Sequence, residues 1–355
     1  MRPVATAFAF CSFRLRLPGQ RGARRDRVPS ARGEAEHATR GPRPVHPPAG
    51  GGTVTVQDIP PRRSAGRRLR RVLLWVSVVV LVVLIGLGMW LAPMLYRVYH
   101  GLDVYETVPP ALPAALPEPA ILIFSKTNGF REDRAILAAN KMFRDIARER
   151  GWGVFVTENA AVFNPEQLSR FRAVVWNNAS GDVLTLPQRK AFRAYLEAGG
   201  GYVGVHGAGG DHTYRWRWYG DDLIGAHFIS HTMFPQIQRA TIRIADPAHP
   251  AMAGLPPAWP RADEWYSFDR SVRARGYRVL ATLDEKSYQP TDLFGNDIRM
   301  GDDHPIIWTH CVGRGRAYYS ALGHAADAYA EPLVRRSLAN AVAWAASEGA
   351  CRNGL

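Results

Sequence analysis

The apolar residues of the chain are distributed in two different patterns. Residues 72–92 form one apolar run of 21 residues without a charge, close to the ~20 that a helix needs to cross the core of a bilayer. Beyond residue 120, short apolar runs typical of buried strands alternate with segments in which apolar residues recur every three or four positions. The first pattern predicts one transmembrane helix. The second predicts a folded domain of alternating strands and helices.

The alternating region predicts both the elements and the class of the domain. A helix between the first two strands stops at Gly151, and another runs from Pro187 to the glycines at 199–201. A closing helix passes through Val334 and Ala345. The predicted strands are 120–124, 153–157, 173–176, 202–205, 241–244, 278–282, 306–308 and 316–319. Strands that alternate with helices pair in parallel, so we expect an α/β domain with a doubly wound, mostly parallel, flavodoxin-like sheet over residues 120–347.

The positive charge of the chain is concentrated before the apolar run. Residues 1–71 hold 16 arginines, no lysine and four acids, which gives +12 of the total net charge of +14. This segment has no sustained period of 2 or 3.6, so we expect a disordered, Arg/Pro-rich tail. The rest of the chain is nearly neutral, and nucleic acid is not an expected partner. RNA contact by the tail is the alternative to its facing anionic lipid.

Charge on either side of the run predicts its orientation. Four arginines lie between residues 67 and 71, whereas only Arg97 and His100 follow the run closely. The positive-inside rule then puts the N-terminus in the cytoplasm and the folded domain on the periplasmic side of the inner membrane. An uncleaved anchor is favoured over a signal peptide, because the run is long and no small-x-small site closes it. Residues 93–119, with five prolines from 108 onward, predict a semi-rigid spacer.

The three cysteines fit no metal or redox spacing. Cys11 falls in the predicted cytoplasmic tail. Cys311 and Cys351 would be able to pair in an oxidising compartment, but the sequence gives no sign that their backbones approach, so we expect two unpaired thiols.

Two turns at the carboxyl ends of predicted strands are the first candidates for chemistry, because ligands of open parallel sheets bind there. The first is Lys126–Arg131. The second, Gly204-Val-His-Gly-Ala208, has the form of a nucleophile elbow with His206 at its centre. Histidine moves protons or binds metals, but it is not the Ser or Cys of an ordinary acyl-enzyme. An amidase that uses this elbow as its nucleophile is therefore disfavoured, and we do not expect a glutamine amidotransferase. The glycines do not make a dinucleotide-binding motif.

Later polar residues suggest further roles. His227 and His231 are four apart, a spacing that on a helix would place both on one divalent metal; hydrogen-bonded structural histidines are the alternative. Glu264 beside Trp265 predicts a general acid or base in a sugar-stacking wall, or else a surface acid with the aromatic residue packed inward. Trp218 and Tyr219 suit either a carbohydrate platform or the core.

Residues Ala120 to Ala346 resemble the ThuA-like family, which is named for trehalose utilisation and has a fold similar to class I glutamine amidotransferases. The motifs that carry the resemblance are Gly204-Val-His-Gly-Ala208 with Asp211, Trp218-Tyr219, Gly225-Ala-His-Phe228 with Ser230-His231, His249-Pro250, Asp263-Glu-Trp-Tyr266, Met300-Gly-Asp-Asp-His-Pro305 with Trp308, and Gly315-Arg316 through Leu322-Gly-His324. The chain departs from the family pattern at Glu132, where His is common, and at Thr232, where Pro is usual. The resemblance implies work on trehalose-like or keto-disaccharides.

Two functional hypotheses follow. The first is a sugar-processing hydrolase, lyase or isomerase on a membrane tether. The second is a noncatalytic sugar-binding or sensing module. In both, the partners are a small carbohydrate and the membrane, and a homo-oligomer is compatible with the sequence. The candidate catalytic residues are His206, Glu264, His324, His231 and Asp303, and the candidate substrate-binding residues are Phe130, Arg131, Asp211, Trp218, Tyr219, Trp265 and His304. A divalent metal is the candidate cofactor.

Overall fold

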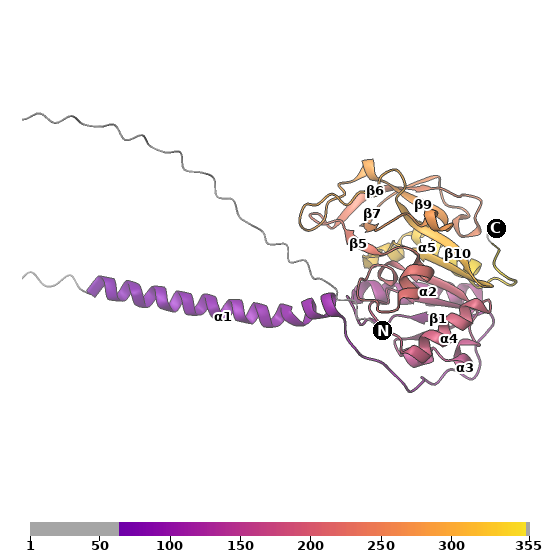
Figure 1. Cartoon of the computed structure of the whole chain (residues 1–355), viewed down its shortest axis with the longest axis horizontal. Helices are drawn as coiled ribbons and strands as arrows, with labels where there is room; N and C mark the ends of the chain where they lie inside the picture. Colours follow the sequence, from indigo (N-terminus) through magenta and orange to yellow (C-terminus); the bar gives the residue numbers. More distant parts are fainter. Residues whose placement is uncertain (1–63, 353–355) are drawn as a thin grey trace, which may run out of the picture. The chain divides into compact units, whose positions relative to one another are not determined.

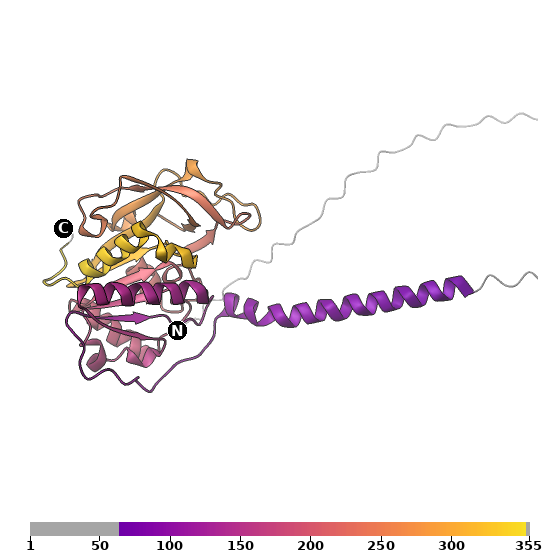
Figure 2. The same ribbon diagram turned by 180° about the vertical axis from the view of Figure 1, so that it is seen from behind.

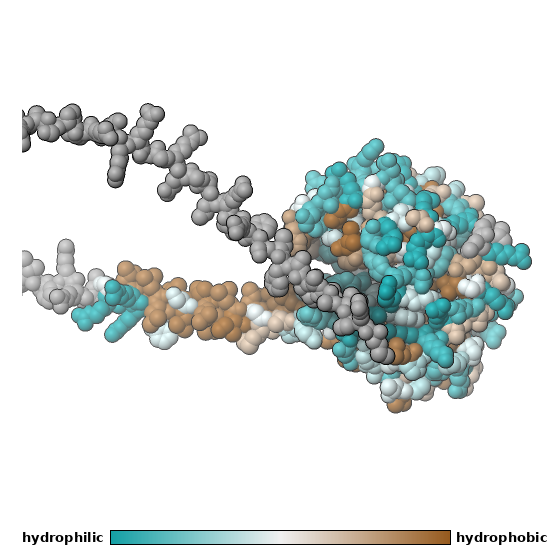
Figure 3. Space-filling view, in the orientation of Figure 1, coloured by the Kyte–Doolittle hydropathy of each residue, from teal (hydrophilic) through white to brown (hydrophobic). Residues whose placement is uncertain are grey.

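The computed structural model describes residues 64–352, so most of the predicted tail and Cys11 lie outside the described residues. Helix α1 (Ser64–His100) contains the whole predicted run 72–92 and extends past it at both ends. By length and composition this helix is able to cross a membrane. Figure 3 shows apolar side chains along its surface, with charged residues at its N-terminal end.

Five strands form the parallel half of the main sheet, in the order β2-β1-β3-β4-β11. They are β1 (Ala120–Phe124), β2 (Gly153–Thr157), β3 (Ala173–Asn177), β4 (Gly201–Val205) and β11 (Gly315–Ser320). β1, β3 and β4 are buried along their whole length. Their apolar runs are continuous because both faces of this half are covered. All five strands were predicted.

The helices cover both faces of the parallel half. They are α2 (Asp133–Arg150), α3 (Pro165–Leu168), α4 (Leu186–Glu197) and α5 (Pro332–Ala345). Because β2 and β3 lie on opposite sides of β1, right-handed crossovers place α2 and the pair α3 and α4 on opposite faces. α5 packs beside α2 (Figure 2). α2 ends where predicted, at Gly151, which takes the left-handed conformation with φ 68°.

Four antiparallel strands extend the sheet from β11 in the order β10-β9-β6-β7 (Figure 1). They are β6 (Ile237–Ile244), β7 (Ala258–Glu264), β9 (Arg278–Asp284) and β10 (Pro305–Val312). A separate two-stranded sheet pairs β5 (Phe228–His231) with β8 (Tyr266–Phe268). The α/β class is confirmed. β5, β7 and β8 were not predicted, because they are short or carry polar residues and proline.

The segment 101–119, which belongs to the predicted semi-rigid spacer 93–119, packs along the domain. Asn159, Gln167 and Gln188 donate side-chain hydrogen bonds to its carbonyls at Val108, Pro110 and Glu106 respectively. Its leucines at 112 and 116 lie against the core. A proline-rich chain leaves its carbonyls without internal partners, and the domain surface supplies donors for them.

A disulfide joins Cys311 in β10 to Cys351 near the end of the described chain, with Cα atoms 5.5 Å apart. The expectation of two unpaired thiols was therefore wrong. The backbone N–H of Cys351 also donates to the carbonyl of Arg314, which directs the C-terminal segment back to the β10–β11 turn. No feature of the sequence indicates that return.

We expect Cys351→Ala to lower the free energy of unfolding, because the disulfide closes a loop of 40 residues in the unfolded chain. The loop-closure model gives an upper value of about 4 kcal/mol. Denaturant unfolding followed by tryptophan fluorescence measures the change. Addition of a reductant should destabilise the native protein and leave the variant unchanged; equal sensitivity of the two proteins would contradict the pairing.

His249 is a buried histidine beneath α5. Its ring makes an edge contact with Trp344 at 4.8 Å, and its Nδ1 accepts the N–H of Ala251 at 3.2 Å. Burial, followed by the nearby charge of Arg278, lowers the pKa of His249 from 6.5 to about 4. The folded protein therefore holds this imidazole neutral at pH values where the unfolded chain binds a proton.

The free energy of unfolding should fall as the pH is lowered from about 6.5 to about 4, because protons then bind the unfolded state first. His249→Gln keeps an acceptor for the Ala251 N–H but does not titrate. The difference in unfolding free energy between native protein and variant should shrink across this pH range. Thermal or urea unfolding at several pH values measures it, and a constant difference would refute the assignment.

Candidate functional site

The loop after β4 forms an elbow that projects His206. Its backbone lies in the left-handed region, with φ 46°, which is uncommon for a residue with a side chain. The ring of Tyr266 stacks on the imidazole with centroids 4.3 Å apart. Gly210 allows this approach, since a Cβ there would lie 2.3 Å from the Tyr266 ring. The elbow predicted from the glycine spacing is thus present, and β8 supplies its partner.

Glu264, at the end of β7, lies at the centre of a cluster of polar side chains. Its Oε2 is 3.3 Å from His206 Nε2 and 3.2 Å from His324 Nδ1, and these two nitrogens are 3.3 Å apart. Glu264 is only 3% exposed. The alternative of a surface acid is therefore excluded. Residues more than 110 positions apart in the chain meet here, from the elbow, β7 and the loop after β11.

Hydrogen bonds define the proton positions on His206. Its Nδ1 lies 2.8 Å from the carbonyl of Ala321, which only accepts, so this nitrogen carries the hydrogen. In the neutral ring, Nε2 is then an acceptor and faces the cluster. The Tyr266 hydroxyl, 2.8 Å away, donates to it. Burial raises the pKa of Tyr266 well above its usual value, so this hydroxyl keeps its proton.

His231 lies at the outer side of the cluster, with 29% of its side chain exposed. Its Nδ1 is 2.9 Å from the Thr232 carbonyl and 3.2 Å from Glu264 Oε1. Both neighbours accept, so Nδ1 carries the hydrogen and Nε2 is left as the basic nitrogen of the neutral ring. A carboxylate behind one ring nitrogen and a free lone pair on the other is the arrangement of a general base.

Asp263, adjacent to Glu264, holds the cluster together without taking part in it. Its carboxylate is fully buried and accepts the backbone N–H groups of Gly323 at 2.9 Å, His324 at 3.2 Å and Glu264 at 3.0 Å. Arg261 balances its charge at 3.1 Å. Asp263 therefore fastens β7 to the loop that carries His324.

The charges of the cluster shift two pKa values in opposite directions. Burial raises the pKa of Glu264, but the neighbouring imidazoles of His206 and His324 outweigh burial, and the net pKa lies well below the usual value. Burial lowers the pKa of His324, but its bond to Glu264 and the charges of Glu264 and Asp263 raise it above 6.5 overall. Glu264 is thus an ionised carboxylate in the interior.

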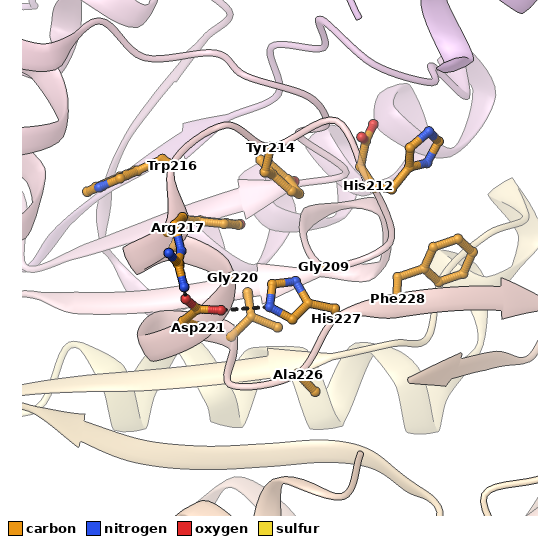
Figure 4. A pocket seen from close by; sticks show the side chains of 13 residues that line it. Gly209, His212, Tyr214, Trp216, Arg217, Gly220, Asp221, Ala226, His227 and Phe228 are labelled. Atoms are coloured by element: carbon orange, nitrogen blue, oxygen red, sulfur yellow. Dashed lines mark hydrogen bonds and ion pairs between the residues drawn. The ribbon is translucent and has the colours of Figure 1, made fainter. Parts of the chain in front are cut away.

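A cavity of about 300 Å³ lies beside the elbow and is lined by aromatic and charged side chains (Figure 4). Its lining includes Asp211, Trp216, Arg217, His227 and Phe228. The ring of Phe228 packs on Tyr266 with centroids 4.8 Å apart. The rings of Phe228 and Tyr266 therefore lie between the cavity and His206, and His206, Glu264 and His324 do not line the cavity.

Three residues predicted to bind substrate lie in the core. Tyr219 stacks on Trp176 at 4.7 Å, and Trp265 donates its indole N–H to the Gln238 carbonyl at 2.8 Å. His304 is fully buried between the Tyr266 carbonyl and Glu285. In all three residues, the polar side-chain atoms that would bind a sugar are already bonded to other groups of the protein. Tyr219 and Trp265 therefore pack in the core and do not stack on a sugar as predicted. His304 has a structural role and not the predicted binding role.

The remaining candidates are spread around the site. Asp303 bonds to Ser271 and Arg273 and does not join Glu264. Arg131 pairs with Glu158 at 2.8 Å, and Phe130 beside it is 41% exposed. Trp218 is half-buried against Trp216. Of the predicted binding residues, Asp211 lines the cavity, and Tyr219 borders it from the core with its hydroxyl already bonded to Tyr202 and the Ala208 carbonyl.

The predicted metal pair is not assembled. The helix that would have brought His227 and His231 together is replaced by β5, which begins directly after His227 and ends at His231. Residues four apart in an extended chain are separated by about 13 Å. His227 is bonded to Asp221 at 2.7 Å and His231 faces Glu264. Among the described residues, the group whose ligand atoms are close enough to share a metal is His206, Glu264 and His324.

Sequence reasoning missed Gln236, which donates its amide to Glu264 Oε1 at 2.5 Å, and the supporting role of Asp263. Nothing in the sequence marks Gln236. Tyr266 had a detectable signal, since alternate residues of an extended stretch share a face, and Glu264 and Tyr266 are two apart.

The fold and site define an α/β domain with a histidine elbow and a buried carboxylate at the strand ends. The sequence model of the ThuA family, described as "Trehalose utilisation", matches residues 120–345. The chain therefore belongs to the ThuA family. No curated protein matches the chain.

The chain is also similar to solved structures. A ThuA-like protein from Bacteroides uniformis is 25% identical, with a TM-score of 0.55 over 67% of this chain and 95% of that one. A ThuA-like protein from Parabacteroides merdae is 18% identical, with a TM-score of 0.49 over 66% and 91% of the two chains.

Asp263→Asn should destabilise the protein by about 3–5 kcal/mol, the usual cost of breaking a buried ion pair from one side. The new amide would also present a donor to backbone N–H groups that need an acceptor. Urea unfolding followed by fluorescence measures the loss. Asp145→Asn on α2, whose carboxylate pairs with Lys141 at the surface, is the matched control and should unfold like the native protein. Equal stability of both variants would refute the support role.

Proposed function

We propose that this chain is a membrane-anchored enzyme of carbohydrate utilisation that removes a proton next to the carbonyl of a keto-disaccharide. The observation that supports this choice is the single carboxylate of the cluster, Glu264, with three imidazoles around it. Hydrolysis of an ordinary glycosidic bond generally uses two carboxyl groups that flank the bond. Asp303, the expected second group, is bonded elsewhere. One carboxylate among histidines favours proton abstraction.

In this proposal His231 is the general base. Its partly exposed side chain is reachable by a substrate, and Glu264 accepts its Nδ1–H. The free Nε2 removes the proton on the carbon between the keto group and the anomeric carbon. Negative charge then develops on the keto oxygen, and His324 and the hydroxyl of Tyr266 are the hydrogen-bond donors of the cluster that would stabilise it.

The enolate can then expel the second sugar. Its electron pair forms the carbon–carbon double bond, and the glycosidic C–O bond breaks with its electrons on the departing oxygen, which takes up a proton. The products are a free sugar and an unsaturated keto-sugar. No oxidant, reductant or water is consumed. The reaction therefore needs only groups that accept and donate protons, and the residues of the cluster are of that type.

The cavity supports a sugar as the ligand. Trp216 and Phe228 offer ring faces for the C–H faces of a pyranose, and Asp211, Arg217 and His227 offer polar atoms for hydroxyl groups. A volume of about 300 Å³ suits a sugar unit more than a macromolecule. One unit in this cavity would leave the neighbouring unit near the elbow.

The location on the outer side of the membrane has two supports. Arginines precede the apolar run and few positive charges follow it. The disulfide between Cys311 and Cys351 is of the kind that persists in oxidising compartments such as the periplasm.

The test uses the full chain in detergent, incubated in D₂O with a 3-keto-disaccharide or with trehalose. We expect solvent deuterium to appear next to the keto group and a free sugar to be released, as followed by NMR and mass spectrometry. Trehalose should remain intact. His231→Ala and Glu264→Gln should lower the rate by roughly 10²–10⁴-fold.

His100→Ala, which removes an exposed histidine at the end of α1, is the control and should keep the native rate. Cleavage of trehalose without deuterium incorporation would replace the proposal by glycosidic hydrolysis. Binding of sugar without any product would favour the noncatalytic sugar-binding module.

A further inference from the structure

The side chains of His206, Glu264 and His324 present three ligand atoms at the corners of a nearly equilateral triangle. The edges, between His206 Nε2, Glu264 Oε2 and His324 Nδ1, measure 3.3, 3.2 and 3.3 Å. A tetrahedral ion bound at ~2.0–2.1 Å separates its ligand atoms by roughly 3.3–3.4 Å. We propose that these three residues bind one divalent transition-metal ion, with Zn²⁺ as the best match to the geometry.

Neighbouring groups hold each ligand in an orientation suited to a metal. The bond from His206 Nδ1 to the Ala321 carbonyl leaves Nε2 with its lone pair toward the triangle. Metal-bound histidines generally donate their second nitrogen to a carbonyl or carboxylate in this way. The second oxygen of Glu264 is taken by Gln236 and His231, which leaves Oε2 for the triangle.

The backbone of two ligands is also fixed from behind. Asp263 accepts the N–H of both Glu264 and His324, and Arg261 neutralises it within the same buried layer. The three ligands come from β7 and two loops, so their convergence depends on these bonds. A pre-formed ligand set of this kind lowers the cost of ordering the site around an ion.

The charge of the cluster also favours a cation. Glu264 is buried, and the ion-pair partners that the described residues give it are imidazoles, with no Lys or Arg among them. A buried carboxylate needs a positive partner. Asp263, its neighbour in the chain, has Arg261, whereas a metal ion at the triangle would meet the same need for Glu264.

Two imidazoles and one carboxylate define the kind of metal. Mixed N₂O sites bind Zn²⁺, Fe²⁺, Co²⁺ or Mn²⁺, whereas Ca²⁺ and Mg²⁺ prefer oxygen ligands. Three protein ligands leave a fourth position open, as in catalytic zinc sites. Tyr266, now bonded to His206 Nε2, would turn its hydroxyl toward the group in that position. The role of the metal rests on the proposed function, because there the ion would polarise the keto oxygen of the substrate.

The experiment titrates the full chain, purified without a histidine tag and stripped with a chelator. Isothermal titration calorimetry with Zn²⁺ should show one ion per chain, and Co²⁺ should give visible bands typical of a four-coordinate site. His206→Ala, His324→Ala and Glu264→Gln should each weaken Zn²⁺ binding by at least about 100-fold. Glu264→Gln is nearly isosteric, and circular dichroism of each variant identifies loss of fold.

His227→Ala and His100→Ala are the matched controls and should keep one Zn²⁺ per chain. Absence of binding to the native protein, or loss of binding in His227→Ala alone, would overturn the site. The sugar assay separates this proposal from the previous one. One Zn²⁺ per chain without turnover of any keto-sugar supports the site and refutes the function. Equal turnover by stripped and loaded protein refutes a role for the ion in the reaction.

Discussion

The site depends on the hydrogen bonds that the buried carboxylate of Asp263 accepts from the backbone. In the sheet order, β10, β9 and β6 lie between β11 and β7, so the end of β7 and the loop after β11 belong to distant parts of one sheet. The bonds from Gly323 and His324 to Asp263 nevertheless join them. The antiparallel half must therefore curve back toward the carboxyl ends of the parallel strands, and Glu264 reaches His206 only because it does.

The parallel half and the antiparallel half differ in how far the sequence predicts them. β1, β3 and β4 are covered on both faces, so their apolar runs are continuous and easily recognised. β7 alternates buried and exposed residues and includes Pro260 and Arg261, and β8 has only three residues. Strands of this kind are stabilised by their neighbours in space. Their position cannot be derived from local pattern.

The candidate site residues also differ in how far the sequence predicts them. His206, Glu264, His231 and His324 were predicted from their chemistry, and the structure brings all four together. Trp265 and His304 carry side chains of equally suitable type but face the interior, where Gln238, Glu285 and the Tyr266 carbonyl satisfy them. Residue type indicates what a side chain is able to do. Which partner it meets depends on contacts between segments far apart in the chain, as the Cys311–Cys351 disulfide also shows.

Two adjacent carboxylates, Asp263 and Glu264, have different surroundings and different roles: the first is structural and the second is chemical. Asp263 accepts hydrogen bonds from three backbone N–H groups and pairs with Arg261. Backbone amides and a guanidinium do not give up their protons, so Asp263 has no partner with which to exchange a proton. Glu264 faces imidazoles, each of which is able to gain or lose a proton or to bind a metal. Environments that set neighbouring acids apart in this way are typical of catalytic centres. The pairing partners, more than burial itself, identify Glu264 as the reactive member.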